Sequence, residues 1–90
     1  MSSIKELAKK IPDNIRSGYL ITEEDPILNA SPKLSNPNMK LLAEIWKKFI
    51  YPNEEITDCP ICMDRILTNF RQMKDDLIEL ERDYRKLNSF

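Results

Sequence analysis

Apolar side chains recur at helical spacing through the C-terminal third of the chain. From Met63 onward, large apolar residues alternate three and four positions apart, which is the a/d spacing of a coiled-coil seam. The series is Met63, Ile66, Phe70, Met73, Leu77, Leu80, Tyr84 and Leu87. Pro60 suits a first helical turn, and neither proline nor glycine follows it. The pattern therefore predicts one long helix over residues 60–88.

A second amphipathic segment precedes this helix. Asn36 and Pro37 form a start signal, because asparagine caps a helix and proline is tolerated at its first position. The apolar stripe that follows consists of Met39, Leu42, Ile45, Trp46, Phe49 and Ile50. A helix over residues 37–50 is expected, and with the long helix it predicts an all-α helical hairpin.

The N-terminal residues 1–18 predict a short helix. Apolar residues recur there at helical spacing, Ser3 is placed to cap the first turn, and Pro12 disrupts continuation beyond about residue 10. The single glycine, Gly18, is expected to close one further turn in a left-handed conformation. This helix is expected to pack on the hairpin.

Residues 19–35 are expected to form a long extended connection. They contain two prolines, an acidic run and five scattered apolar residues: Leu20, Ile21, Ile27, Leu28 and Leu34. Either these apolar residues pack against the helices, which is the preferred interpretation, or the segment orders on a partner. The whole chain, residues 1–90, is predicted to be one small domain, with the hairpin occupying residues 36–90.

The two hairpin helices differ in length. At 1.5 Å per residue, residues 37–50 extend about 21 Å and residues 60–88 about 42 Å, so an antiparallel partner covers only half of the long helix. The overhanging seam residues are predicted to be partner-binding: Leu77, Leu80, Tyr84 and Leu87. The N-terminal helix, a second copy of the chain, or another protein would have to cover them.

Charged residues occupy the rest of the long helix. Acidic and basic side chains alternate in sign, which predicts a solvated face rather than an acid/base pair. They are Asp75, Asp76, Glu79, Glu81 and Asp83 with Arg71, Lys74, Arg82, Arg85 and Lys86. Like charges would meet in a simple two-stranded homodimer, which favours an intramolecular or heterologous partner.

Composition narrows the function classes. Lys plus Arg number 14 and Asp plus Glu 15, giving a net charge of −1, so nucleic-acid binding is disfavoured. No apolar run approaches the roughly 20 residues that cross a bilayer, so a cytoplasmic protein without membrane attachment is expected. Histidine is absent and glycine occurs once. These absences disfavour an enzyme, because imidazole is the commonest titrating base and phosphate-cradling loops need glycine.

One short motif carries chemistry, Cys59-Pro60-Ile61-Cys62 at the predicted start of the long helix. The preferred interpretation is that both thiols are small side chains packed at the interhelical turn. A second is zinc, shared as a four-cysteine site between two copies, or bound more weakly with Asp58 and Asp64. A third is redox chemistry, with Cys59 as nucleophile and Cys62 as the resolving thiol.

The stretches over residues 41–46 and 58–63, followed by Ile66 and Leu67, resemble small proteins of phages and mobile elements of gut Bacteroidales, including crAss-like phages. These stretches are LLAEIW and DCPICM, and the resemblance covers about a third of the chain. It implies an apolar helix, a short polar turn and a Cys-x-x-Cys helix start. It also implies a phage or accessory-gene origin and a virion component as one role, in the host cytoplasm or the virion.

The function expected from the sequence is therefore non-catalytic protein binding in assembly, through the C-terminal half of the long helix. The partner would be another protein or a second copy of the chain. The alternative is a zinc-bridged or redox-sensing regulator built on Cys59 and Cys62, with a dimer that associates with nucleic acid as one form of it. A small enzyme with a cysteine nucleophile is a third interpretation.

Overall fold

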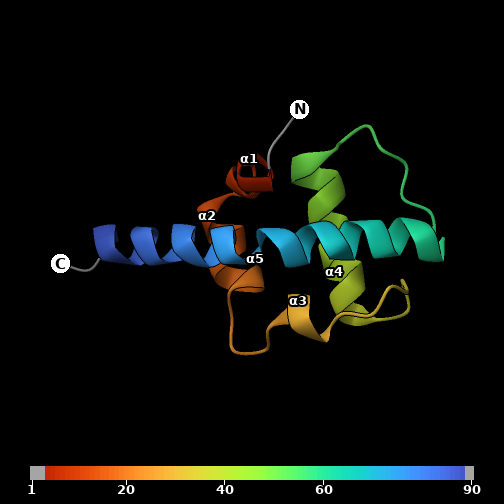
Figure 1. The fold of residues 1–90 in the computed structure, drawn as a ribbon, viewed down its shortest axis with the longest axis horizontal. Helices are drawn as coiled ribbons and strands as arrows, with labels where there is room; N and C mark the ends of the chain where they lie inside the picture. Colours follow the sequence, from red (N-terminus) through yellow and green to blue (C-terminus); the bar gives the residue numbers. More distant parts are fainter. Residues whose placement is uncertain (1–3, 89–90) are drawn as a thin grey trace.

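A single long helix extends from one end of the molecule to the other in the computed structural model, which describes residues 4–88 (Figure 1). This helix, α5 (Pro60–Asn88), has 29 residues. It is about 43 Å long at 1.5 Å per residue, which accounts for the longest dimension of the molecule, 45 Å. The backbone carbonyl of Cys59 accepts the first helical hydrogen bond from the amide of Met63 at 2.9 Å, so the helix begins at Pro60 as predicted.

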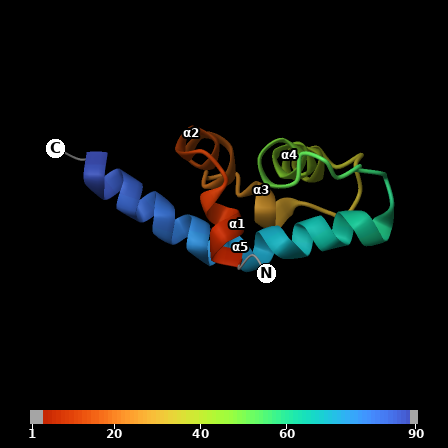
Figure 2. The same ribbon diagram turned by 90° about the horizontal axis from the view of Figure 1, so that it is seen from above.

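The second predicted helix consists of α4 (Pro37–Ile45) and the π-helical turn η2 (Trp46–Ile50) that continues it. Asn36 caps the helix by accepting a hydrogen bond from the amide of Met39 at 3.0 Å, which confirms the predicted start. Figures 1 and 2 show that α4 crosses α5 steeply instead of running alongside it. α4 contacts both α5 and the short helix α3 (Pro26–Asn29).

The N-terminal segment forms three short elements: α1 (Ile4–Lys9), α2 (Asp13–Ile15) and the π-helical turn η1 (Arg16–Leu20). α1 packs against α5, and Pro12 separates it from α2, as the sequence predicts. Ser3, the predicted cap, lies outside the described residues. The left-handed conformation expected of Gly18 is wrong, because this glycine lies inside η1 without a positive φ. The turn instead closes at Ile21, whose amide donates to the carbonyl of Arg16 at 2.8 Å.

The connection over residues 19–35 is not extended throughout, which corrects the prediction. It contains the helical turn α3 (Pro26–Asn29), because Asp25 caps it by accepting a hydrogen bond from the Leu28 amide at 3.2 Å. Asp25 adopts a left-handed conformation, with φ of 45°. Its other carboxylate oxygen lies 2.5 Å from the ammonium of Lys74 on α5. The segment is thus fixed to the long helix.

One hydrophobic core joins all these elements. The residues of the connection divide between core and surface: Ile27 is fully buried, whereas Leu28 is exposed, contrary to expectation. The largest fully buried side chains are Trp46, Phe70, Leu20, Ile27, Met39, Leu42, Met63, Ile66, Leu67, Met73 and Leu77. Residues 4–88 contain helices and connecting turns without any β-strand, so the predicted all-α class is confirmed.

Candidate functional site

The seam of α5 passes from the core to the surface along its C-terminal half. Leu77 has no exposed surface, Leu80 is partly buried against the core, Tyr84 is 36% exposed and Leu87 is 71% exposed. Figures 1 and 2 both show that the last turns of α5 extend beyond the other elements. We call residues 82–87 of α5 the terminal arm.

The four predicted partner-binding residues therefore fall into three groups. Leu77, predicted to bind a partner, is instead covered within the single chain, because this side chain belongs to the core. Its burial follows from the N-terminal elements, since α1 and η1 both pack against α5. Leu80 lies at the boundary. Tyr84 and Leu87 are the members of the predicted surface that are exposed.

A buried polar cluster lies at the base of the terminal arm. The guanidinium Nε of Arg16 donates to Glu81 Oε1 at 3.1 Å, and the Ser17 hydroxyl donates to the same oxygen at 2.6 Å. The second oxygen of Glu81 accepts from Arg85 Nε at 2.9 Å. Arg16 and Glu81 are both almost completely buried. We refer to these four residues as the Glu81 cluster, which ties η1 to α5.

Burial by itself raises the pKa of the Glu81 carboxyl, because the charged form loses its hydration. The hydrogen bonds from Ser17, Arg16 and Arg85 act in the opposite direction and together hold the pKa below its ordinary value. The carboxylate is therefore charged at neutral pH and compensates the buried guanidinium. Hydrogen bonds of this kind, to charged groups, are among the stronger ones in proteins.

Arg16 also connects the cluster to the terminal arm. Its guanidinium lies 5.5 Å from the centre of the Tyr84 ring, over the ring face, and pairs with Asp13 at 2.8 Å. A cation at this distance from a ring face is attracted electrostatically by the quadrupole of the ring. The first turn of the arm is thus held in a fixed position against η1, while Leu87 lies one turn further out.

Sequence reasoning missed this cluster. Glu81 was assigned to a solvated face because the charges of α5 alternate in sign, and that assignment is wrong. The available signal is positional: Glu81 follows Leu77 by four residues and so lies on the same side of the helix as the core seam. A carboxylate there requires a buried partner. The sequence alone does not identify Arg16 as that partner.

The two cysteines lie at the start of α5, and both are free and partly exposed. The backbone amides of Cys62 and Ile61 donate toward the Cys59 sulfur, with a further hydrogen bond from the Cys62 side chain, and these lower the pKa of the Cys59 thiol. Cys62 packs against the edge of the core and accepts a hydrogen bond from the Thr57 hydroxyl at 3.8 Å. Cys59 therefore has the more reactive geometry of the two.

The residues predicted as weaker metal ligands are not gathered around the thiols. Within residues 4–88, no three or more His, Cys, Asp or Glu side chains are arranged to hold a metal ion. Asp58 instead accepts a hydrogen bond from the Leu34 amide at 3.4 Å. A zinc site at Cys59 and Cys62 would therefore need ligands from a second chain.

No known protein family, curated protein or solved structure matches the chain. Among the helices formed by the described residues, none is both long enough and apolar enough to span a membrane.

Proposed function

We propose that this chain is a non-catalytic protein-binding module that acts in assembly, and that it binds through the terminal arm of α5 with Leu80 at its base. The observation that carries the proposal is the exposure of Leu87 and Tyr84 on turns that extend beyond the rest of the molecule. Exposed large apolar residues on one side of a helix favour contact with another protein.

The spacing of these residues supports the same mode of binding. Leu80, Tyr84 and Leu87 lie four and three positions apart, so they share one face of the helix. A helix that lies in an apolar groove of a partner uses anchors at this spacing. The Glu81 cluster supports the proposal further, because it fixes the direction in which the arm leaves the body.

The resemblance to small proteins of Bacteroidales phages favours an accessory or virion component as the biological setting. In that setting the protein would act in the host cytoplasm or in the assembled particle. An arm that presents apolar side chains to a neighbour is a common device for joining subunits.

Site-specific photo-crosslinking tests the proposal. A photoreactive amino acid at position 87 should give a discrete covalent adduct in cells that express the protein from its native source. The same group at position 28 is the matched control, because Leu28 is also exposed, at 66%, but lies on α3, which belongs to the body of the molecule. Equal adduct yields from both positions, or none from position 87, would contradict the proposal.

A second candidate function is a redox-responsive thiol pair. The specific observation is that Cys59 and Cys62, both free and partly exposed, lie one turn apart at the start of a long helix, where backbone amides lower the pKa of Cys59. A low-molecular-weight disulfide would oxidise the pair. The Cys59 thiolate attacks it and displaces one thiol, and Cys62 then displaces the second from the mixed disulfide. Two protons leave the protein, and two electrons pass to the reagent.

Thiol titration in glutathione redox buffers tests this candidate, with mass spectrometry to detect the loss of two hydrogens. Metal analysis of the purified protein tests the zinc-bridged version, which requires about half a zinc per chain and two chains per site. A Cys59→Ser variant should be unable to form the internal disulfide. Failure of the wild-type protein to form it under oxidising conditions would exclude the redox role.

A further inference from the structure

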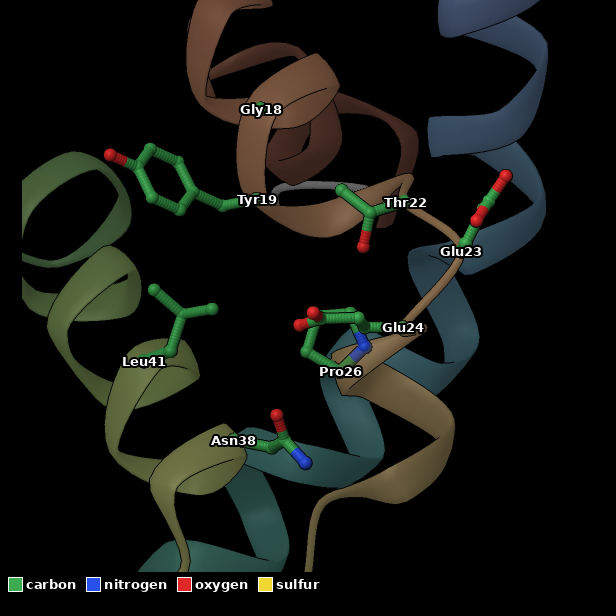
Figure 3. Close-up of a pocket in the computed structure, with 8 residues that line it drawn as sticks. All are labelled: Gly18, Tyr19, Thr22, Glu23, Glu24, Pro26, Asn38 and Leu41. Atoms are coloured by element: carbon green, nitrogen blue, oxygen red, sulfur yellow. The ribbon is translucent and has the colours of Figure 1, made fainter.

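A surface groove lies between η1 and α4 (Figure 3). Figure 2 shows that the N-terminal elements and α4 lie on the same side of α5. It consists of two adjoining hollows of about 400 and 230 Å³, which share Tyr19 and Leu41. The first hollow also includes Pro26 and Asn38, and Ile15 and Phe49 line the second. Its walls thus combine aromatic and aliphatic side chains from the N-terminal elements α2 and η1, from α3, and from α4 and η2.

The charges at this groove are mainly acidic. Glu24 extends toward the first hollow in Figure 3, whereas Glu23 points away toward α5. Glu44 borders the second hollow together with Lys48. Two carboxylates, Glu24 and Glu44, therefore face the groove, against the one ammonium group of Lys48.

The terminal arm carries mainly basic charge, which is complementary to the acidic charge at the groove. Between residues 82 and 87 it carries Arg82, Arg85 and Lys86 against one acidic side chain, Asp83, and Arg85 pairs with Glu81 of its own helix. Its apolar residues, Tyr84 and Leu87, are exposed beside them. Pairing two arms with each other would place like charges together, whereas pairing an arm with the groove places opposite charges together.

We infer that the groove between η1 and α4 binds the terminal arm of a second copy of this chain. The inference rests on the proposed function and names the partner of the arm. Leu87 would pack against Tyr19 and Leu41, which both hollows share, with Arg82 and Lys86 next to Glu24 and Glu44.

The arm of the same copy cannot fill this groove. η1 presents Arg16 and Ser17 to α5, where Glu81 binds both. The next residues of the same turn, Gly18 and Tyr19, line the groove on its other side. The Glu81 cluster therefore holds the arm against the side of η1 that faces away from the groove, and the occupant must come from another molecule.

This geometry makes the contact head-to-tail. Each copy offers one arm and one groove, which are different surfaces, so the interface is heterologous. Such contacts either close into a ring or continue as a chain of subunits. The association should weaken with added salt, because opposite charges on the surface contribute to it.

Light scattering and sedimentation velocity of the full-length protein, over concentrations up to the millimolar range, test the inference. The wild-type chain should associate as concentration rises. Two charge-reversed double variants should each raise the dissociation constant at least about tenfold: Glu24→Lys with Glu44→Lys in the groove, and Arg82→Glu with Lys86→Glu in the arm. Mixing the two variants should restore association, because the groove of each then matches the arm of the other.

The matched control is Glu55→Lys with Glu79→Lys, which makes the same change in net charge at exposed residues outside the groove. It should associate like the wild type, and circular dichroism should confirm that all variants fold. A wild-type chain that stays monomeric, or two variants that do not complement each other, would overturn the inference. A non-self adduct from position 87 would in that case still support the proposed function, so the two failures are distinguishable.

Discussion

Arg16 and Glu81 are 65 positions apart in the sequence and form a buried ion pair, with 3.1 Å between Nε and Oε1. The pair joins the π-helical turn η1 to the last third of α5. It is also the point where α5 leaves the core, since Leu77 before it is fully buried and Leu87 after it is mostly exposed. The ion pair therefore marks the base of the proposed binding arm.

Removing the carboxylate should destabilise the fold strongly. Glu81→Ala removes the buried partner of the Arg16 guanidinium and leaves it only the exposed carboxylate of Asp13. Removing one partner of a buried ion pair typically costs about 3–5 kcal/mol. Urea denaturation followed by circular dichroism measures the change. Glu79→Ala, at an exposed position on the same helix, is the control and should change the free energy of unfolding by less than about 0.5 kcal/mol. Similar effects of both substitutions would show that the Glu81 cluster does not stabilise the fold.

Stability should fall in acid. The folded protein holds the pKa values of Glu81 and Asp25 below their ordinary values, so the unfolded chain takes up protons first as the pH falls. The two carboxylates contribute fully to the free energy of unfolding above the ordinary carboxyl pKa. This contribution is lost as the pH falls through their pKa values in the folded protein. With no histidine in the chain, imidazole titration adds nothing near neutrality. Thermal denaturation from neutral to acidic pH should show this loss, and Glu81→Gln should show a smaller one.

Alanine substitutions along the seam of α5 should lower the free energy of unfolding strongly at buried positions and little at exposed ones. Leu77→Ala should cost about 2–5 kcal/mol, because it leaves a cavity among fully buried neighbours. Leu87→Ala should change the free energy of unfolding by less than about 0.5 kcal/mol, since the side chain is mostly exposed. Denaturant titrations of both variants provide the test. A large loss for Leu87→Ala would show that the arm is covered within the monomer.

The substitution Asp25→Asn should destabilise the fold less than Asp25→Ala does. Asp25→Asn keeps the cap on α3 and suits the left-handed backbone, and loses only the partly exposed pair with Lys74, worth about 1 kcal/mol or less. Asp25→Ala loses the cap as well, which adds about 1 kcal/mol. Thermal melts should rank the variants in this order. Equal destabilisation would mean that the pair with Lys74 is the dominant contribution.

The two thiols should differ in reactivity. The pKa of Cys59 is lowered by the backbone amides of Cys62 and Ile61, so its thiolate forms at lower pH than that of an ordinary cysteine. Alkylation with iodoacetamide over a pH series, read by peptide mass spectrometry, should show Cys59 reacting at lower pH than a thiol of a short reference peptide. A coincident pH dependence would contradict this. The denatured protein provides the control, because its backbone amides are no longer held next to the Cys59 sulfur and Cys59 should then react like the reference thiol.

Local signals were sufficient for the main helices. Asn36 and Pro37 predicted the start of α4, Pro60 predicted the start of α5, and the spacing of apolar residues predicted the core face of α5 as far as Met73. These features depend on neighbouring residues only. The same kind of signal, Asp25 before Pro26, was present at α3 but was outweighed by the surrounding prolines and charges.

Long-range contacts were not predictable in the same way. The burial of Glu81 depends on Arg16, which comes from a different part of the chain, and the burial of Leu77 depends on how the N-terminal elements fold back. From the sequence alone, the N-terminal helix, a second copy of the chain and another protein were all possible covers for this part of the seam. Likewise, Tyr19 and Leu41 come to line the same hollow only through the tertiary fold, which brings η1 and α4 to its two sides.

The Glu81 cluster has a consequence for the kinetics of recognition. Only about two helical turns follow it, and they continue a 29-residue helix that is already formed. A partner that meets this segment has no disordered chain to fold, so little conformational entropy is lost on association. We therefore expect encounter rates typical of preformed surfaces, with differences in affinity expressed mainly in how long each complex lasts.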